Sequence, residues 1–227
     1  MHPVRSSRAR TAGLLICGAL LVFGFAGCAP EPGDTGPGSG AGRDAGTGAG
    51  SEAGAGAGAL TDLSNGGECR DGQDVTIAMD DASAVLSGSC GRVEITGNDV
   101  RANIDAAAAV VLRGDGITVL GERFERAEAL GANGTLNVDD LGEVTVEGDG
   151  ATVINQRAES IRVLGSAATL NGTDVERLSL DGRDARVVLT GELGALELHG
   201  DDNRVSWRSG VRKPDVDTGS GNAYERG

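Results

Sequence analysis

The chain has 227 residues, a net charge of −14 at pH 7 and only 2% aromatic residues. This length accommodates one domain with appendages. The strong negative charge argues against binding to nucleic acid and against adhesion of the protein's own surface to anionic lipid, while it suits cationic or metal-bridged partners.

Residues 1–27 have the pattern of a secretory signal sequence. Arg5, Arg8 and Arg10 form a basic start, and an apolar stretch follows over residues 12–26. This stretch is too short and too close to the N-terminus to be a membrane span. We therefore expect residues 1–27 to direct secretion and to be removed.

The signal ends in Phe25-Ala26-Gly27-Cys28, which resembles the bacterial lipobox, a run of small residues before a cysteine. Phe25 stands where that pattern usually has leucine. The resemblance implies that Cys28 becomes the mature N-terminus and is thioether-linked to a diacylglycerol, which anchors the protein to the extracytoplasmic face of the cell membrane. The alternative is an ordinary cleaved signal with an incidental cysteine.

Residues 28–60 predict a disordered tether, because they are rich in Gly, Ala, Pro, Ser, Thr and acids. Such a segment cannot bury enough apolar surface to fold. A flexible chain of this length spans on the order of 30 Å. We expect it to hold a folded domain, residues 61–227, away from the membrane.

A short phrase recurs in that domain: two aliphatic residues two positions apart, followed by a glycine. Its clearest copies begin at Val144, Ile161, Leu178 and Leu196. The spacings between their first residues are 17 (144 to 161), 17 (161 to 178) and 18 (178 to 196). A second apolar phrase lies between them and keeps the same interval, at Val153, Leu170, Val188 and Val205.

This periodicity predicts an all-β, single-stranded parallel β-helix, or β-solenoid. Alternating apolar and polar residues mark a strand with one buried face, and a fixed short period is typical of stacked repeats. Two short strands per coil leave no room for a helix, and each coil rises about 4.8 Å. The glycines are expected to supply positive φ at the corners. The alternative, an antiparallel sandwich, has no reason to keep one register over three intervals.

Earlier copies are assigned to Val75, Val93 and Ile117. Their spacings are 18 (75 to 93), 24 (93 to 117) and, up to Val144, 27 (117 to 144). The long intervals predict irregular rungs over residues 98–143.

Segments outside the regular register are expected to be loops or caps. Residues 122–130 are expected to be a loop with at most one helical turn. We expect an irregular cap at residues 61–74, and a cap strand with a loose end at residues 208–227.

Cys69 and Cys90 are expected to form a disulfide that staples the N-terminal edge of the solenoid, because disulfides persist outside the cytoplasm. A redox or metal pair is the alternative, but the spacing of the two cysteines is 21 (69 to 90) rather than two, and no histidine lies near them.

Several features together resemble domain-of-unknown-function family 3060 of secreted and lipid-anchored actinobacterial proteins. They are Cys28, the Cys69 and Cys90 pair around a first rung, phrases such as residues 93–97, and the ending at residues 203–222. The resemblance covers roughly residues 65–225. The family has no established activity, so it implies a stacked solenoid and no catalytic residue.

Candidate chemistry is sparse. His199 has no visible partner and is expected on the surface. Acids at the corners, including the pairs that begin at Asp80, Asp139 and Asp201, would stack in a solenoid. Such a column suits Ca²⁺ or polysaccharide cleavage, although solvated acids are the simpler interpretation. Asparagines near the turns favour internal ladders over ligand contacts. They are Asn98, Asn133, Asn155, Asn171 and Asn203.

We therefore expect a non-enzymatic, lipid-anchored interaction module of the cell envelope, with no catalytic residue, metal or cofactor. Its partners would be the membrane through Cys28 and a cell-wall polymer or envelope protein. The alternatives are a polysaccharide-active enzyme or a calcium-binding module that uses corner carboxylates. A third is a ligand-carrying lipoprotein. A groove with opposed carboxylates and an arginine would favour the enzyme, and a wide internal void the carrier.

Overall fold

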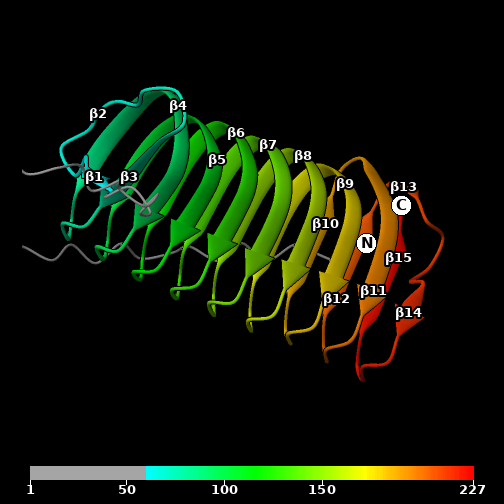
Figure 1. The fold of residues 1–227 in the computed structure, drawn as a ribbon. Helices are drawn as coiled ribbons and strands as arrows, with labels where there is room; N and C mark the ends of the chain where they lie inside the picture. The colour runs from blue at the N-terminus through cyan, green and yellow to red at the C-terminus, as the bar shows by residue number, and fades with distance from the viewer. Residues whose placement is uncertain (1–59) are drawn as a thin grey trace, which may run out of the picture. The chain divides into compact units, whose positions relative to one another are not determined.

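Each coil of the chain stacks on the one before it and runs in the same direction (Figure 1). The computed structural model describes residues 60–227. In these residues it is a parallel β-solenoid, as the periodicity predicts. The signal sequence, Cys28 and the tether up to residue 59 lie outside the described residues.

The described chain forms 15 strands joined in one parallel sheet that winds on itself. Their bounds are β1 Thr61–Asp62, β2 Gly67–Glu68, β3 Gln73–Ile77, β4 Ser83–Ile95, β5 Arg101–Leu112, β6 Thr118–Ala129, β7 Thr135–Val146, β8 Thr152–Val163, β9 Thr169–Leu180, β10 Arg186–Leu189, β11 Glu192–Leu198, β12 Arg204–Trp207, β13 Ser209–Gly210, β14 Val216–Asp217 and β15 Ala223–Arg226.

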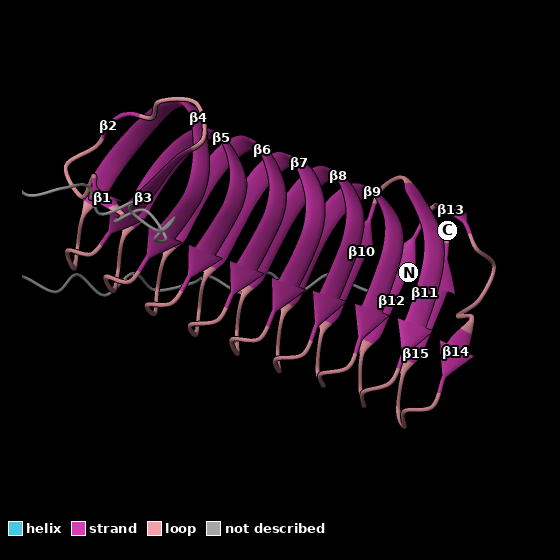
Figure 2. Ribbon diagram, viewed as in Figure 1, coloured by secondary structure: helices cyan, strands magenta, loops and turns pink. Residues whose placement is uncertain are grey.

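A central coil consists of one long strand and one tight turn. Strands β5 to β9 have 12 residues each. Each bends near its middle, and the turns line up along one edge of the solenoid (Figure 2). The two apolar phrases of a coil are therefore the two arms of one bent strand rather than two separate short strands.

The register of the regular coils agrees with the sequence. Val144 pairs with Ile161, Ile161 with Leu178, and Leu178 with Leu196. Two residues along, a file of buried side chains runs through four coils, with each member at most 2% exposed. This file consists of Val146, Val163, Leu180 and Leu198.

The prediction of irregular rungs over residues 98–143 is wrong, because the 17-residue interval of the regular coils continues through this segment. Val93 pairs with Val110, Val110 with Ala127, and Ala127 with Val144. Ile117 lies just before β6, at the start of the other arm. Residues 122–130 are not a loop, since residues up to Ala129 belong to strand β6.

In these coils alanine takes the place of several branched aliphatic residues, and Phe124 supplies one large side chain to the interior. Its side chain is fully buried, and its register partner in the preceding coil is Ala107. A Cβ at Gly121 would collide with the Phe124 ring. Small residues around one large ring keep the interior at normal density.

Both ends extend the solenoid further than expected. β1 pairs with β3 and β2 with β4, so much of residues 61–74 forms an incomplete first coil. At the other end, β13 and β14 pair with β11, and β15 pairs with β12. The C-terminal segment therefore ends in a strand rather than in a loose end.

The glycine after each regular strand has a different role from the one predicted. Gly114, Gly131, Gly148 and Gly165 have no positive φ. A Cβ at any of them would collide with the carbonyl oxygen of the equivalent glycine one coil before. Positive φ occurs two residues further on in the turn, at positions that include Asp99, Asn133 and Ala167.

Candidate functional site

A groove runs over the bend of the strands, across β6 to β9 and β11. Its volume is about 760 Å³. Its floor is the bent backbone, beneath which Leu141, Ala158 and Val175 are buried. We call this feature the bend groove.

One side of the bend groove carries charges that alternate from coil to coil. Arg123 pairs in register with Asp140, Asp140 with Arg157, and Arg157 with Asp174. Because successive coils are about 4.8 Å apart, like charges in this row recur at about 9.6 Å.

Asp140 is held between two arginines. Its carboxylate lies 2.6 Å from Nη2 of Arg157 and 3.4 Å from Nη2 of Arg123. The hydrogen bond from Arg157, with a smaller contribution from Arg123, lowers the pKa of Asp140 below its ordinary value of 3.8. Asp140 is therefore ionised at neutral pH and is a poor proton donor.

The second side of the groove lies two residues further along each strand. It carries Glu125, Glu159 and Glu176, all exposed, and it is interrupted by Gly142 and Gly194. A Cβ at either glycine would collide with the carbonyl of the preceding coil, so these residues allow close stacking and leave the groove open.

The groove is acidic overall. Within residues 60–227, the carboxylates of Glu125, Glu159 and Glu176 make no hydrogen bond or ion pair. Its lining holds two arginines against six acids, which are Glu125, Asp140, Glu159, Asp174, Glu176 and Glu192. An arrangement of this kind attracts cations.

Acids at the tight turns have a structural role. Asp115 Oδ1 accepts a hydrogen bond from the backbone N–H of Ala132, and Asp149 Oδ1 accepts one from Ser166, both at 2.7 Å. Asp80 and Asp201 do the same for the turns that follow them. These corner acids therefore bind the backbone of the next coil.

The acidic pairs do not form one column. The pairs beginning at Asp80 and Asp201 lie at tight turns, whereas Asp139 and Asp140 lie at the bend. Among residues 60–227, no group of three or more His, Cys, Asp or Glu side chains is arranged to hold a metal ion.

The expected ladder of five asparagines does not form, because only Asn203 among them lies inside a corner and bonds to neighbouring coils. Asn203 is fully buried, accepts from the N–H of Ala185 and donates to the carbonyl of Gly182. Asn222 repeats the pattern one coil later.

The other asparagines do not share one position. Asn98 accepts from the N–H of Asp115, like the corner acids, and Asn133 is at the positive φ. Asn171 is exposed on a strand. Asn155 points inward, and its Oδ1 is buried without a hydrogen-bond partner.

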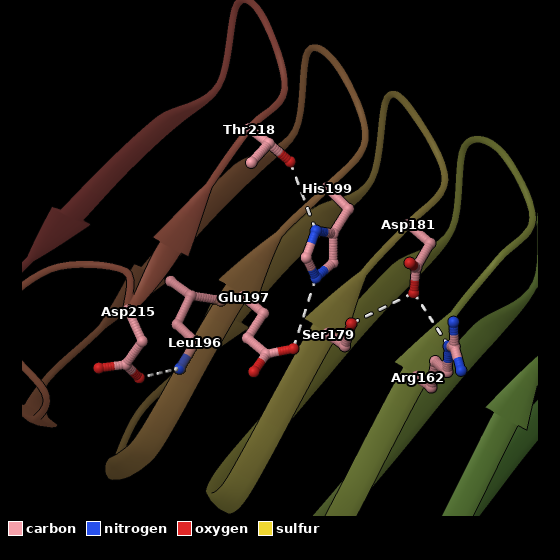
Figure 3. Close-up of polar contacts among 8 residues, drawn as sticks. All are labelled: Arg162, Ser179, Asp181, Leu196, Glu197, His199, Asp215 and Thr218. Atoms are coloured by element: carbon pink, nitrogen blue, oxygen red, sulfur yellow. Dashed lines mark hydrogen bonds and ion pairs between the residues drawn. The ribbon is translucent and has the colours of Figure 1, made fainter.

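His199 lies on the surface after β11, as expected, and away from the bend groove. Its Nδ1 is 3.4 Å from the Thr218 hydroxyl, and its Nε2 is 3.5 Å from a Glu197 carboxylate oxygen (Figure 3). Neighbouring contacts, such as Arg162 with Asp181, link successive coils in the same way.

The cysteine predictions have separate outcomes. Cys69 and Cys90 form the predicted disulfide, with Cα atoms 5.1 Å apart, and both are buried. It joins the first coil to the second at the bend. Cys28 lies outside the described residues, so its lipidation stays a prediction.

Sequence reasoning missed the bend groove. Arg123, Asp140, Arg157 and Asp174 follow one another at the spacing of the regular repeat, so the same period would have found them. The presumed irregularity of residues 98–143 hid the first two of these positions.

Comparison of this chain with known proteins identifies no relative. A scan against protein-family models and searches of curated proteins and of solved structures find no match to this chain. The resemblance to domain-of-unknown-function family 3060 therefore stays a prediction. Among residues 60–227, no helix is long and apolar enough to cross a membrane.

Proposed function

We propose that this protein is a non-enzymatic interaction module of a bacterial cell envelope, anchored outside the plasma membrane by a lipid on Cys28. It holds an extended, positively charged partner in the bend groove. The observation that supports this proposal is the row of Glu125, Glu159 and Glu176, whose carboxylates are unpaired within the described residues, along a groove that crosses several coils. The partner is an amine-bearing wall polymer or a basic segment of an envelope protein.

Binding of an oligolysine peptide to the full chain tests the groove. Replacing Glu125, Glu159 and Glu176 together with Gln should weaken this salt-sensitive binding about tenfold, since each exposed charge contributes up to about 1 kcal/mol. The matched control removes three exposed acids elsewhere and should leave most of the affinity. Equal losses in both variants would show that net charge, not the groove, attracts the peptide. The control positions are Glu68, Glu147 and Glu225.

The anchor is tested separately. Cys28→Ala should move the protein from the membrane to the soluble fraction without changing its fold, because the tether separates the anchor from the solenoid. Detergent-phase partitioning equal to that of the wild type would contradict lipidation.

A second candidate function is cleavage of a polysaccharide. The bend groove places Asp140 and Asp174 across from Glu159 and Glu176, with Arg157 between the two aspartates. Hydrolysis needs one protonated carboxyl group, and the lowered pKa of Asp140 makes Asp140 unsuited to that role, so the candidates lie among the other acids of the groove, such as Glu159. Release of new reducing ends from envelope polysaccharide, abolished by Glu159→Gln, would favour this enzyme. No geometry among the described residues favours the calcium alternative.

A further inference from the structure

One outward column of the solenoid carries aliphatic side chains in every second coil. Val85 is 60% exposed, Leu120 45%, Ile154 36% and Val188 36%. They make up half of the eight large hydrophobic residues exposed in the described chain. Their alignment on one face distinguishes them from scattered surface apolar residues, which need no explanation.

Asparagines occupy the coils between them. Val85 pairs with Asn103, Asn103 with Leu120, and Leu120 with Asn137. The alternation continues through Ile154 and Asn171 to Val188. We call these seven residues the neutral strip. Within residues 60–227, the side-chain amides of its asparagines make no hydrogen bond.

The columns on either side of the neutral strip differ in charge. Two residues before it, Arg101 is followed by four threonines in successive coils, Thr118, Thr135, Thr152 and Thr169. Two residues after it, the second, third and fourth coils of the strip carry acids, Asp105, Glu122 and Asp139.

From this pattern we propose that the neutral strip is the interface of a parallel homodimer, in which two solenoids pack side by side with a two-fold axis along the strip. Each coil then faces the same coil of the second copy. Aliphatic side chains meet aliphatic side chains, and asparagine amides, which both donate and accept, pair with each other.

Charge selects the parallel arrangement. The two-fold axis along the strip reverses the order of the flanking columns, so Arg101 faces Asp105 of the second copy. Likewise Thr118 faces Glu122, and Thr135 faces Asp139. In the antiparallel arrangement, each flanking column faces itself, and centring on Asn137 would place Asp139 against Asp139. A slip by one coil would bury amides against aliphatic side chains.

The size of the strip fits a modest dimer. Seven coils of about 4.8 Å and five residues of about 3.3 Å give a face of about 34 by 16 Å. Two such faces bury about 1,100 Å², which is near the lower limit for a specific interface. An uncharged strip is also the surface by which two chains of net charge −14 can approach with least repulsion.

Single cysteines in the full chain test the interface and its orientation. In the parallel dimer Leu120→Cys and Ile154→Cys each lie on the axis, so each alone should form a disulfide-linked dimer under mild oxidation. The native Cys69 and Cys90 are already bonded to each other, and Cys17 and Cys28 are common to every variant, so crosslinking is scored against that of the wild-type chain. The matched control is Leu164→Cys, which is similarly exposed at 39% but lies in a turn, and it should form no disulfide-linked dimer.

The outcomes are distinct. Crosslinking at both strip positions but not at Leu164 supports the proposal. Crosslinking at Ile154 alone, or only when both cysteines are combined, contradicts the parallel arrangement. No crosslink in the folded protein contradicts the dimer and leaves the strip to a partner other than this chain.

A second measurement does not depend on disulfide formation. Ile154→Asp would place two carboxylates face to face on the axis and should raise the dimer dissociation constant more than about tenfold in sedimentation equilibrium. Leu164→Asp should leave the dissociation constant unchanged. Equal dissociation constants for both variants, or a monomeric wild-type chain, would overturn the proposal.

Discussion

Individual polar residues at the tight turns hold one coil to the next. A turn leaves backbone N–H groups without a strand partner, and an unpaired group near the core is costly. Asn98, Asp115 and Asp149 each accept a hydrogen bond from an N–H group one coil further on. The acidic composition of the turns therefore contributes to stability as well as to solubility.

The two acids of one turn should differ in their effect on stability. Asp149→Ala removes the acceptor of the Ser166 N–H and should lower the free energy of unfolding by about 1 kcal/mol. Glu147→Ala removes the same charge from an exposed side chain in that turn and should change it by less than about 0.5 kcal/mol. Urea denaturation measures both. Equal losses would mean that charge, not the hydrogen bond, matters.

At the scale of strands, the sequence predicts the fold where the core residues are large. Val144, Ile161, Leu178 and Leu196 mark four coils correctly because branched aliphatics are easily recognised. Between residues 98 and 143 the signal fails, because two of the buried positions of β6 are alanines, Ala127 and Ala129, rather than branched aliphatic residues.

The bend groove was not predicted for a related reason. Its charges lie on the outward side of the bend, where the two-residue alternation of the strands is interrupted. The direction of the side chains at such a bend depends on the register of neighbouring coils. Only the interval of the repeat, applied to charged residues, would have brought Arg123, Asp140 and Arg157 together.

The glycines that follow the strands recur in more coils than the branched aliphatic residues do, because each of them stacks on the glycine of the preceding coil. Gly148→Ala should destabilise the protein by about 2–3 kcal/mol, because its Cβ would collide with the Gly131 carbonyl oxygen. Gly134→Ala is the matched control. A Cβ there is 3.7 Å from the nearest atom, and the next coil has Ala151 at the same position. Thermal unfolding that does not distinguish the two variants would contradict the close stacking.

The whole solenoid is close to one-dimensional, since each coil contacts the coils directly before and after it. In such proteins stability is approximately a sum over coils and interfaces, and the ends open first. The first coil is incomplete, with the two-residue strands β1 and β2, and the Cys69–Cys90 disulfide joins it to β4. The Cys69–Cys90 disulfide therefore reinforces the interface between the incomplete first coil and the second coil.

Removing this disulfide should consequently act on one end of the molecule. The loop-entropy estimate for the closed segment is about 3 kcal/mol. We expect Cys69→Ala with Cys90→Ala to lose that stability mainly in the N-terminal coils, because the central coils keep both of their neighbours. Hydrogen exchange should accelerate in β1 to β4 and stay near the wild-type rate in β8 and β9.

A matched disruption at the centre, Val163→Asp, buries an unpaired charge between two coils and should accelerate exchange on both sides of β8. Uniform acceleration in the cysteine variant would show that the solenoid unfolds as one cooperative unit instead.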